Sequence, residues 1–229
     1  MTRRRVSNLL ALAVLACLFE RPMHPYEIST TLRSRGKEQS IKLNYGSLYA
    51  VVESLQKHAL ITSQATLREG KRPERTVYAI TEAGLAEFED WLAELLSTPT
   101  QEFTSLEAGL SLMAGLPADE VARLLEDRCT RLEVELRTLT VSHKVAREQK
   151  LPEVFLIESL FRETMVRAEL GFVRKLAKDI RTSVLPGTKV WRRIHELRDS
   201  GLDMEQIMAD PVTLLGEEAR ALASLPQEP

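Results

Sequence analysis

Apolar residues recur along the 229-residue chain with two spacings, and each spacing predicts one kind of element. Spacings of three and four residues, which place side chains on one face of a helix, cover most of the chain. Two stretches of alternating character on either side of residues 69–74 indicate the strands of a hairpin. The pattern predicts a mainly α protein with one two-stranded hairpin. We expect helices near residues 7–19, 26–35, 46–59, 82–96, 105–114, 118–149, 153–182 and 217–225, and strands near 61–67 and 75–80.

Residues that favour helix ends support these helix boundaries. Ser7 is the predicted cap of the first helix, and Thr81 is the predicted cap of the helix that follows the hairpin. Pro25 suits the first turn of the second helix, which Gly36 can close in a left-handed conformation.

The helix near residues 46–59 and the hairpin after it form a unit with polar surfaces. Its buried face is predicted to hold Leu48, Val52, Leu55 and Ala59. The hairpin turn, residues 69–74, carries basic residues. A solvent-facing helix beside such a hairpin predicts a winged helix-turn-helix domain that binds double-stranded DNA. The candidate DNA contacts are Tyr26, Asn44, Tyr45, Ser47, Tyr49, Gln56, Lys57, Lys71, Arg72 and Arg75; for those assigned to bases, an ordinary solvated helix face stays an alternative.

A heptad seam dominates the second half of the chain. It runs without a break through four repeats, at Ala118, Ala122, Leu125, Cys129, Leu132, Leu136, Leu139, His143 and Ala146. The helix near residues 153–182 has two adjacent apolar stripes, so it needs two neighbours. The seam helix supplies one neighbour in an antiparallel hairpin, and a second subunit would supply the other; a monomeric helical core is the alternative. The candidate dimer-interface residues are Leu125, Leu132, Leu136, Leu139, Ile157, Phe161, Ala168 and Phe172.

Charge changes this picture little. The formal net charge of −2 gives no global field that would attract nucleic acid. Lys and Arg outnumber Asp and Glu by 13 to 10 through residue 92 and trail them by 18 to 23 afterwards, which is compatible with a DNA-reading N-terminal half.

Candidate catalytic chemistry is sparse. Cys17 and Cys129 form no CxxC pair, and the four histidines lack the spacing of metal ligands, so we expect buried reduced thiols, no metal and no cofactor. The sequence shows no phosphate loop or nucleophile motif, which argues against an enzyme.

The N-terminus has two readings. Arg3-Arg4-Arg5 followed by the apolar run 9–19 resembles a secretion signal, with a lipoprotein-like box at residues 14–17. The apolar run continues past Cys17, however, which favours a buried first helix in a cytoplasmic protein. No run is long enough for a membrane span, so no membrane partner is expected.

These motifs together are similar to those of PadR-family transcriptional regulators. The matching segments are residues 23–28, 46–49, Leu55, 60–61, 77–84, 108–117 and 162–180. The resemblance implies a homodimeric repressor with a winged N-terminal domain and a helical C-terminal dimerisation domain. Two features depart from the family pattern. Ala59 stands where the family usually has glycine, which predicts a less tightly turned helix exit, and the tail beyond Ser183 exceeds the usual length.

The resulting assignment has three parts: a winged-helix DNA-binding domain at 1–97, a helical dimerisation domain at 98–182 and a helical tail at 183–229. The tail reads as a docking segment or as a second helix-turn-helix. We expect a sequence-specific regulator on a two-fold operator, and whether a small hydrophobic or aromatic effector releases it is open. Candidate effector-pocket residues are Phe88, Trp91, Leu95 and Phe103, with core packing as the alternative for Trp91. The alternative function is a protein-interaction adaptor without DNA binding.

Overall fold

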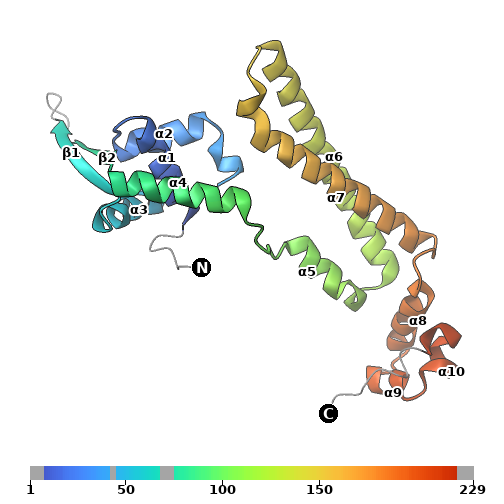
Figure 1. Ribbon diagram of the computed structural model, residues 1–229. Coiled ribbons are helices and arrows are strands. Elements are labelled where there is room, and N and C mark those ends of the chain that lie inside the picture. Colours follow the sequence, from blue (N-terminus) through green and yellow to red (C-terminus); the bar gives the residue numbers. More distant parts are fainter. Residues whose placement is uncertain (1–7, 42–44, 68–74, 221–229) are drawn as a thin grey trace. The chain divides into compact units, whose positions relative to one another are not determined.

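The computed structural model describes residues 8–41, 45–67 and 75–220, and its chain forms two compact units, Met1–Gln101 and Glu102–Pro229 (Figure 1). The fold is mainly α with a two-stranded antiparallel sheet, as the sequence predicts. The three-part division with a separate tail stays a prediction. Among the described residues, no helix is both long and apolar enough to cross a membrane.

The first unit is a winged helix. Its elements are α1 (Leu9–Glu20), α2 (Pro25–Ser34), the 3-10 turn η1 (Lys37–Gln39), α3 (Tyr45–Lys57), β1 (Ile61–Leu67), β2 (Arg75–Ile80) and α4 (Glu82–Ser97). The two strands pair from Ile61 opposite Ile80 to Leu67 opposite Arg75. Met23, just before α2, adds a short bridge to the sheet, because its N–H and C=O both bond to Tyr78 at 3.0 Å.

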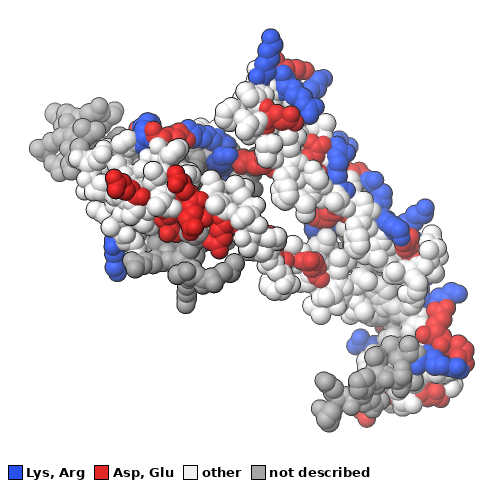
Figure 2. Space-filling view, viewed as in Figure 1, with Lys and Arg blue, Asp and Glu red and all other residues white. Residues whose placement is uncertain are grey.

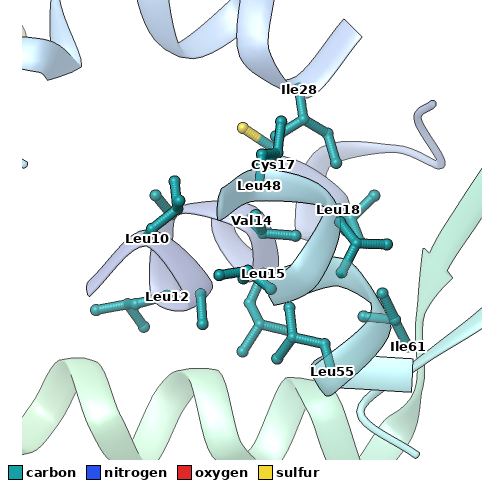
Figure 3. Close-up of a cluster of buried hydrophobic side chains, with 14 of the residues drawn as sticks. Leu10, Leu12, Val14, Leu15, Cys17, Leu18, Ile28, Leu48, Leu55 and Ile61 are labelled. Atoms are coloured by element: carbon teal, nitrogen blue, oxygen red, sulfur yellow. The ribbon is translucent and has the colours of Figure 1, made fainter. Parts of the chain in front are cut away.

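Helix α1 is the centre of this unit. Its apolar residues are buried on nearly every side, and Val14, Leu15 and Cys17 lie among side chains from α2, α3 and β1 (Figure 3). The apolar run that resembles a secretion signal is therefore core sequence in the folded protein. Burial also raises the pKa of the Cys17 thiol to about 11, so the thiol is protonated at neutral pH.

The cap of α1 lies one residue away from the predicted cap. Asn8, rather than Ser7, caps α1: its Oδ1 accepts a bond from the N–H of Leu10 at 2.9 Å. Ser7 itself lies outside the described residues. Both residue types make good caps, and the pattern of apolar residues alone does not choose between neighbours.

The exit of α3 is tightly turned, contrary to the prediction. Ala59 is exposed rather than buried and adopts the left-handed conformation with φ 56°. The N–H of Ala59 bonds to Gln56 O at 2.9 Å, and that of Leu60 bonds to Leu55 O at 3.0 Å. These are the two bonds of a Schellman motif, so an alanine here takes the place that glycine usually occupies.

The second unit begins with α5 (Ser105–Leu112), the 3-10 turn η2 (Met113–Gly115) and two long antiparallel helices, α6 (Ala118–Glu148) and α7 (Ile157–Arg181), with the 3-10 turn η3 (Glu153–Leu156) between them. The heptad seam of α6 packs against the stripe of α7 formed by Val166, Leu170, Val173, Ala177 and Ile180. Ion pairs link the two helices on their flanks: Arg128 with Glu169 at 2.6 Å, Arg162 with Glu135 at 2.6 Å and Arg174 with Glu133 at 2.7 Å.

The predicted antiparallel hairpin accounts for only one of the two stripes on α7. Leu125 and Leu132, which we assigned to a dimer interface, are buried inside the hairpin, and Leu136 and Leu139 are half-buried against the same cluster. Ile157, Phe161, Ala168 and Phe172 are exposed, Phe161 by 66% and Phe172 by 55%. The dimer interface stays a prediction, and these four residues are the part of it that one chain leaves uncovered.

The segment after α7 folds as short helices: α8 (Thr188–Asp199), α9 (Met204–Ala209), α10 (Pro211–Leu215) and the 3-10 turn η4 (Glu217–Ala219). Helix α8 docks on the connection between α5 and α6. Trp191 Nε1 donates to Leu116 O at 2.8 Å, and His195 Nε2 bonds to Ala114 O at 2.9 Å. The helix predicted near 217–225 is only the turn η4 in its described part, and residues 221–225 lie outside the described chain.

Candidate nucleic-acid interface

One face of α3 is fixed in the core and the opposite face is exposed. Leu48, Val51, Val52 and Leu55 are buried against α1 and α2. This differs from the predicted face at two residues: Val51 in the middle of the helix is also buried, and Ala59 is exposed. Because four buried residues set the rotation of the helix about its axis, the side chains on the other face have a defined direction.

The exposed face is a stripe formed by Gly46, Tyr49, Ala50, Glu53 and Lys57. Tyr49 is 56% exposed and Gln56 lies beside the stripe, also exposed. The small residues Gly46 and Ala50 were not among our predicted contacts. Their spacing of four residues on the exposed face is the signal that identifies them, because small side chains let a helix backbone approach a groove closely.

The start of α2 is a second exposed surface, held by a capping box. His24 Nδ1 accepts from the N–H of Tyr26 at 3.1 Å, and Glu27 Oε2 accepts from the N–H of His24 at 2.9 Å. That backbone hydrogen bond keeps the pKa of the Glu27 carboxyl below its usual value, so the box is formed at neutral pH. Tyr26 stands outside it, 64% exposed.

The exit of α3 is tied to the start of α4. Thr81 Oγ1 donates a hydrogen bond to Ala59 O at 2.8 Å and accepts one from the N–H of Gly84 at 3.0 Å. The Thr81 N–H bonds to Leu60 O at 3.1 Å. Gly84 is buried here, and a Cβ at this position would lie 1.9 Å from Leu60 O. This junction holds α3, the base of the wing and α4 in one arrangement.

The remaining predicted DNA contacts are partly outside what the structure describes. Lys57 is exposed at the end of α3 and Ser47 is half-buried near its start. Tyr45 begins α3 and Arg75 begins β2, but their side chains are not described. Asn44, Lys71 and Arg72 lie outside the described residues.

Charge separates α4 from the other surfaces of this unit. It carries five acidic residues and no Lys or Arg, and acidic side chains gather over it in the face shown in Figure 2. A surface of this sign repels phosphate. The face of α3 and the start of α2 are therefore better suited to contact a nucleic acid than α4 is.

The predicted effector residues do not share one environment. Trp91 is 4% exposed in the core of the first unit, and Phe88 stacks on Phe19 with ring centroids 5.7 Å apart. Leu95 and Phe103 are exposed. Across the part of the chain that the structure describes, no three His, Cys, Asp or Glu residues are grouped to hold a metal ion.

Comparison with known proteins relates this geometry to a family. The sequence model of the transcriptional regulator PadR-like family matches residues 14–90, which begin within α1 (Leu9–Glu20), include α2 to β2, and end within α4 (Glu82–Ser97). A search of curated protein sequences finds no significant match.

Solved structures extend the likeness to both units. Bacillus subtilis PadR in complex with operator DNA is similar with a TM-score of 0.61 and 17% identity, over 75% of this chain and 98% of that one. The same protein in complex with p-coumaric acid gives 0.52 and 16%, over 72% and 99%. The Vibrio cholerae virulence activator AphA gives 0.55 and 14%, over 76% and 99%. At these identities the likeness concerns the fold. Residues 14–90 thus match the transcriptional regulator PadR-like family, and the unit that contains them has a winged-helix fold.

Proposed function

We propose that the protein is a sequence-specific DNA-binding regulator of transcription, a repressor that acts as a homodimer on a two-fold operator. The observation that carries this proposal is the exposed stripe of α3 beside a wing, in a domain that matches the PadR-like family. The solved complex of a similar protein with operator DNA supports it.

In this proposal α3 enters the major groove. Tyr49, Ser47 and Gln56 reach base edges or nearby phosphates, with Gln56 suited to adenine and Lys57 to phosphate. Glu53 lies in the middle of the stripe, where a carboxylate repels phosphate but accepts a hydrogen bond from the amino group of cytosine. An acidic residue at this position therefore favours base contact over non-specific binding.

Phosphate contacts would come from the elements around α3. Tyr26 at the exposed start of α2, and Asn44 and Tyr45 just before and at the start of α3, are placed in sequence to meet the backbone. Lys71 and Arg72, in the sequence between the strands, and Arg75, at the start of β2, would supply positive charge for the wing.

The second subunit would cover the exposed stripe of α7. Ile157, Phe161, Met165, Ala168 and Phe172 present an uncharged apolar surface that water contacts in one chain. Exposed apolar surface of this kind marks an interaction site, and an isologous contact lets the same stripe serve both protomers. Two winged domains joined in this way would meet two half-sites.

The repressor role and its release by an effector rest on likeness alone. A similar protein was solved with p-coumaric acid, an aromatic carboxylate, which supports a small aromatic or hydrophobic effector for this protein as well. The residues Phe88, Trp91, Leu95 and Phe103 stay a prediction for its pocket. Of these, Trp91 is buried in the core, and Phe88 is half-buried against it.

The test compares variants on DNA fragments selected from genomic DNA by the purified protein. Tyr49→Ala should weaken binding to the selected site by about tenfold or more and leave binding to random DNA nearly unchanged, since a base contact contributes about 1–3 kcal/mol. Glu89→Ala on α4 is the matched control, exposed in the same unit but on the acidic surface, and should retain specific binding.

A second variant separates phosphate contacts from base contacts. Neutralising Lys71 and Arg72 together should weaken selected and random DNA alike and reduce the slope of log affinity against log salt by roughly two per subunit. Absence of DNA affinity, with salt-insensitive binding to a protein partner, would contradict the proposal and favour an adaptor.

A further inference from the structure

The second unit contains a groove that the proposed function does not use. It lies between α5 and α6 and has a volume of about 520 Å³, within the roughly 300–1,000 Å³ of small-molecule sites. Its apolar lining comes from both helices and includes Leu106, Leu110, Met113, Val121, Leu125 and Leu132.

The middle of the groove is open. Gly109 on α5 lines it, and no heavy atom lies within 4 Å of the position that a Cβ on this glycine would take. A longer side chain would have entered the groove at this point. The sequence thus leaves space in front of α5 for an occupant that is not part of the described chain.

The charged residues of the groove leave one cation uncompensated. Asp127, Arg128 and Glu135 also line it, and each is held by an ion pair outside the groove lining: with Arg123 at 2.9 Å, Glu169 at 2.6 Å and Arg162 at 2.6 Å, respectively. Arg131 has no such partner among the described residues, and its guanidinium is available to an anion.

The groove has an apolar end and a polar end. The short connection Met113–Pro117 reverses the chain, so α5 and α6 run roughly antiparallel (Figure 1). Leu116 and Val121 therefore lie at the joined end, and Ser105 and Arg131 lie toward the other end. This order matches a ligand with an apolar body and a negatively charged group at one end.

We propose that the groove between α5 and α6 binds a small organic anion with an apolar body, whose carboxylate pairs with Arg131 and accepts a hydrogen bond from the Ser105 hydroxyl. Arginine suits this role because its planar guanidinium meets a carboxylate through two parallel bonds. The binding itself does not depend on the proposed function; only its use as an effector site does.

A second copy of the chain fits the groove less well than it fits the stripe of α7. The groove combines its apolar floor with four charged side chains, whereas the stripe from Ile157 to Phe172 is uncharged. The centres of protein interfaces are depleted of charged residues, while small-molecule sites combine apolar walls with a few polar groups.

The experiment measures binding by calorimetry to the full-length protein without DNA. The probes are 4-phenylbutyrate and 4-phenylbutanol, which share an apolar body and differ in charge. The wild type should bind the carboxylate about tenfold or more tighter than the alcohol, because a hydrogen bond to a charged partner supplies at least that factor. Arg131→Gln should abolish this preference, and Gly109→Leu should block both probes.

Arg137→Gln is the matched control, because Arg137 is exposed on the same helix and does not line the groove. It should bind as the wild type does. The proposal is wrong if the wild type shows no saturable binding of 4-phenylbutyrate, or if Arg131→Gln keeps the preference for the carboxylate. If the wild type is a dimer, binds neither probe, and becomes monomeric through Gly109→Leu, the groove is a subunit contact and the proposal is likewise overturned. None of these results depends on whether the protein binds DNA.

Discussion

The junction between α3, the wing and α4 can be tested by adding one methyl group, in the variant Gly84→Ala. An added Cβ at Gly84 would lie 1.9 Å from Leu60 O and 2.9 Å from Cγ1 of Ile80. Side chains can adjust to close contacts, but Leu60 O belongs to the backbone at the end of α3. Gly84→Ala should therefore push α4 away from the start of β1.

The cost follows from what this displacement breaks. Leu60 O accepts a bond from the N–H of Thr81 at 3.1 Å and shares the Thr81 hydroxyl proton with Ala59 O, with Oγ1 3.1 Å from Leu60 O and 2.8 Å from Ala59 O. Two weakened hydrogen bonds cost about 1–3 kcal/mol, and overpacking adds about 1–3 kcal/mol. Replacing a helical glycine by alanine returns about 1 kcal/mol. We expect a net loss of about 1–5 kcal/mol in the free energy of unfolding.

The two tryptophans allow this loss to be measured in the correct unit. Trp91 is buried in the first unit, and Trp191 lies in the second. In a Trp191→Phe background, fluorescence during urea denaturation reports the first unit through Trp91. The control is Gly171→Ala on α7, where a Cβ meets no heavy atom within 4 Å. Its unfolding in urea is monitored by circular dichroism. This variant should gain up to about 1 kcal/mol. A Gly84→Ala variant as stable as its parent would refute the reasoning about the junction.

Three further predictions concern stability and reactivity. Ala59→Gly should stabilise the first unit by about 0.5–1 kcal/mol in urea denaturation. Glycine removes the strain of a left-handed alanine, about 1–2 kcal/mol, and this gain exceeds the cost of the extra conformational entropy of the unfolded chain. Lys150→Gly, at a residue with the same φ of 56° after α6, should have the same effect in the second unit. Hydrogen bonds from Arg167 and then His143 lower the pKa of Glu163, so their contribution is present above the unfolded pKa near 4.5 and lost as pH falls through the folded pKa; Glu163→Gln should make acid unfolding, followed by circular dichroism, less steep. Cys17, with a pKa of about 11 and a buried side chain, should react with a thiol reagent such as DTNB only after denaturation, and rapid reaction of the Cys129→Ser variant in native buffer would contradict its burial.

The parts of the fold that the sequence predicted well are those with long regular patterns. The seam runs along α6, a helix of 31 residues, so its need for a helical partner and the two apolar stripes on α7 were recognisable without coordinates. The same pattern did not show which stripe a single chain would bury. That choice depends on how α7 rotates against α6, and both stripes are apolar.

Shorter features escaped prediction because their causes are local or depend on tertiary contacts. The left-handed Ala59 contradicts the residue's own preference and is imposed by the Schellman bonds and by packing of Leu60. Gly46 and Ala50 carry no functional group, so only their exposure makes them part of the stripe on α3. The groove beside Arg131 exists only because α5 docks along α6.

The central claim is that two α3 helices in one dimer read two half-sites, and the spacing of those half-sites tests it most directly. Binding is measured by fluorescence anisotropy on the selected site, on the same site with about half a helical turn inserted between the half-sites, and on a site with the same insertion outside them. The account predicts that the central insertion abolishes specific binding, leaves weak salt-dependent binding, and that the outer insertion has no effect. Unchanged affinity after the central insertion would contradict it.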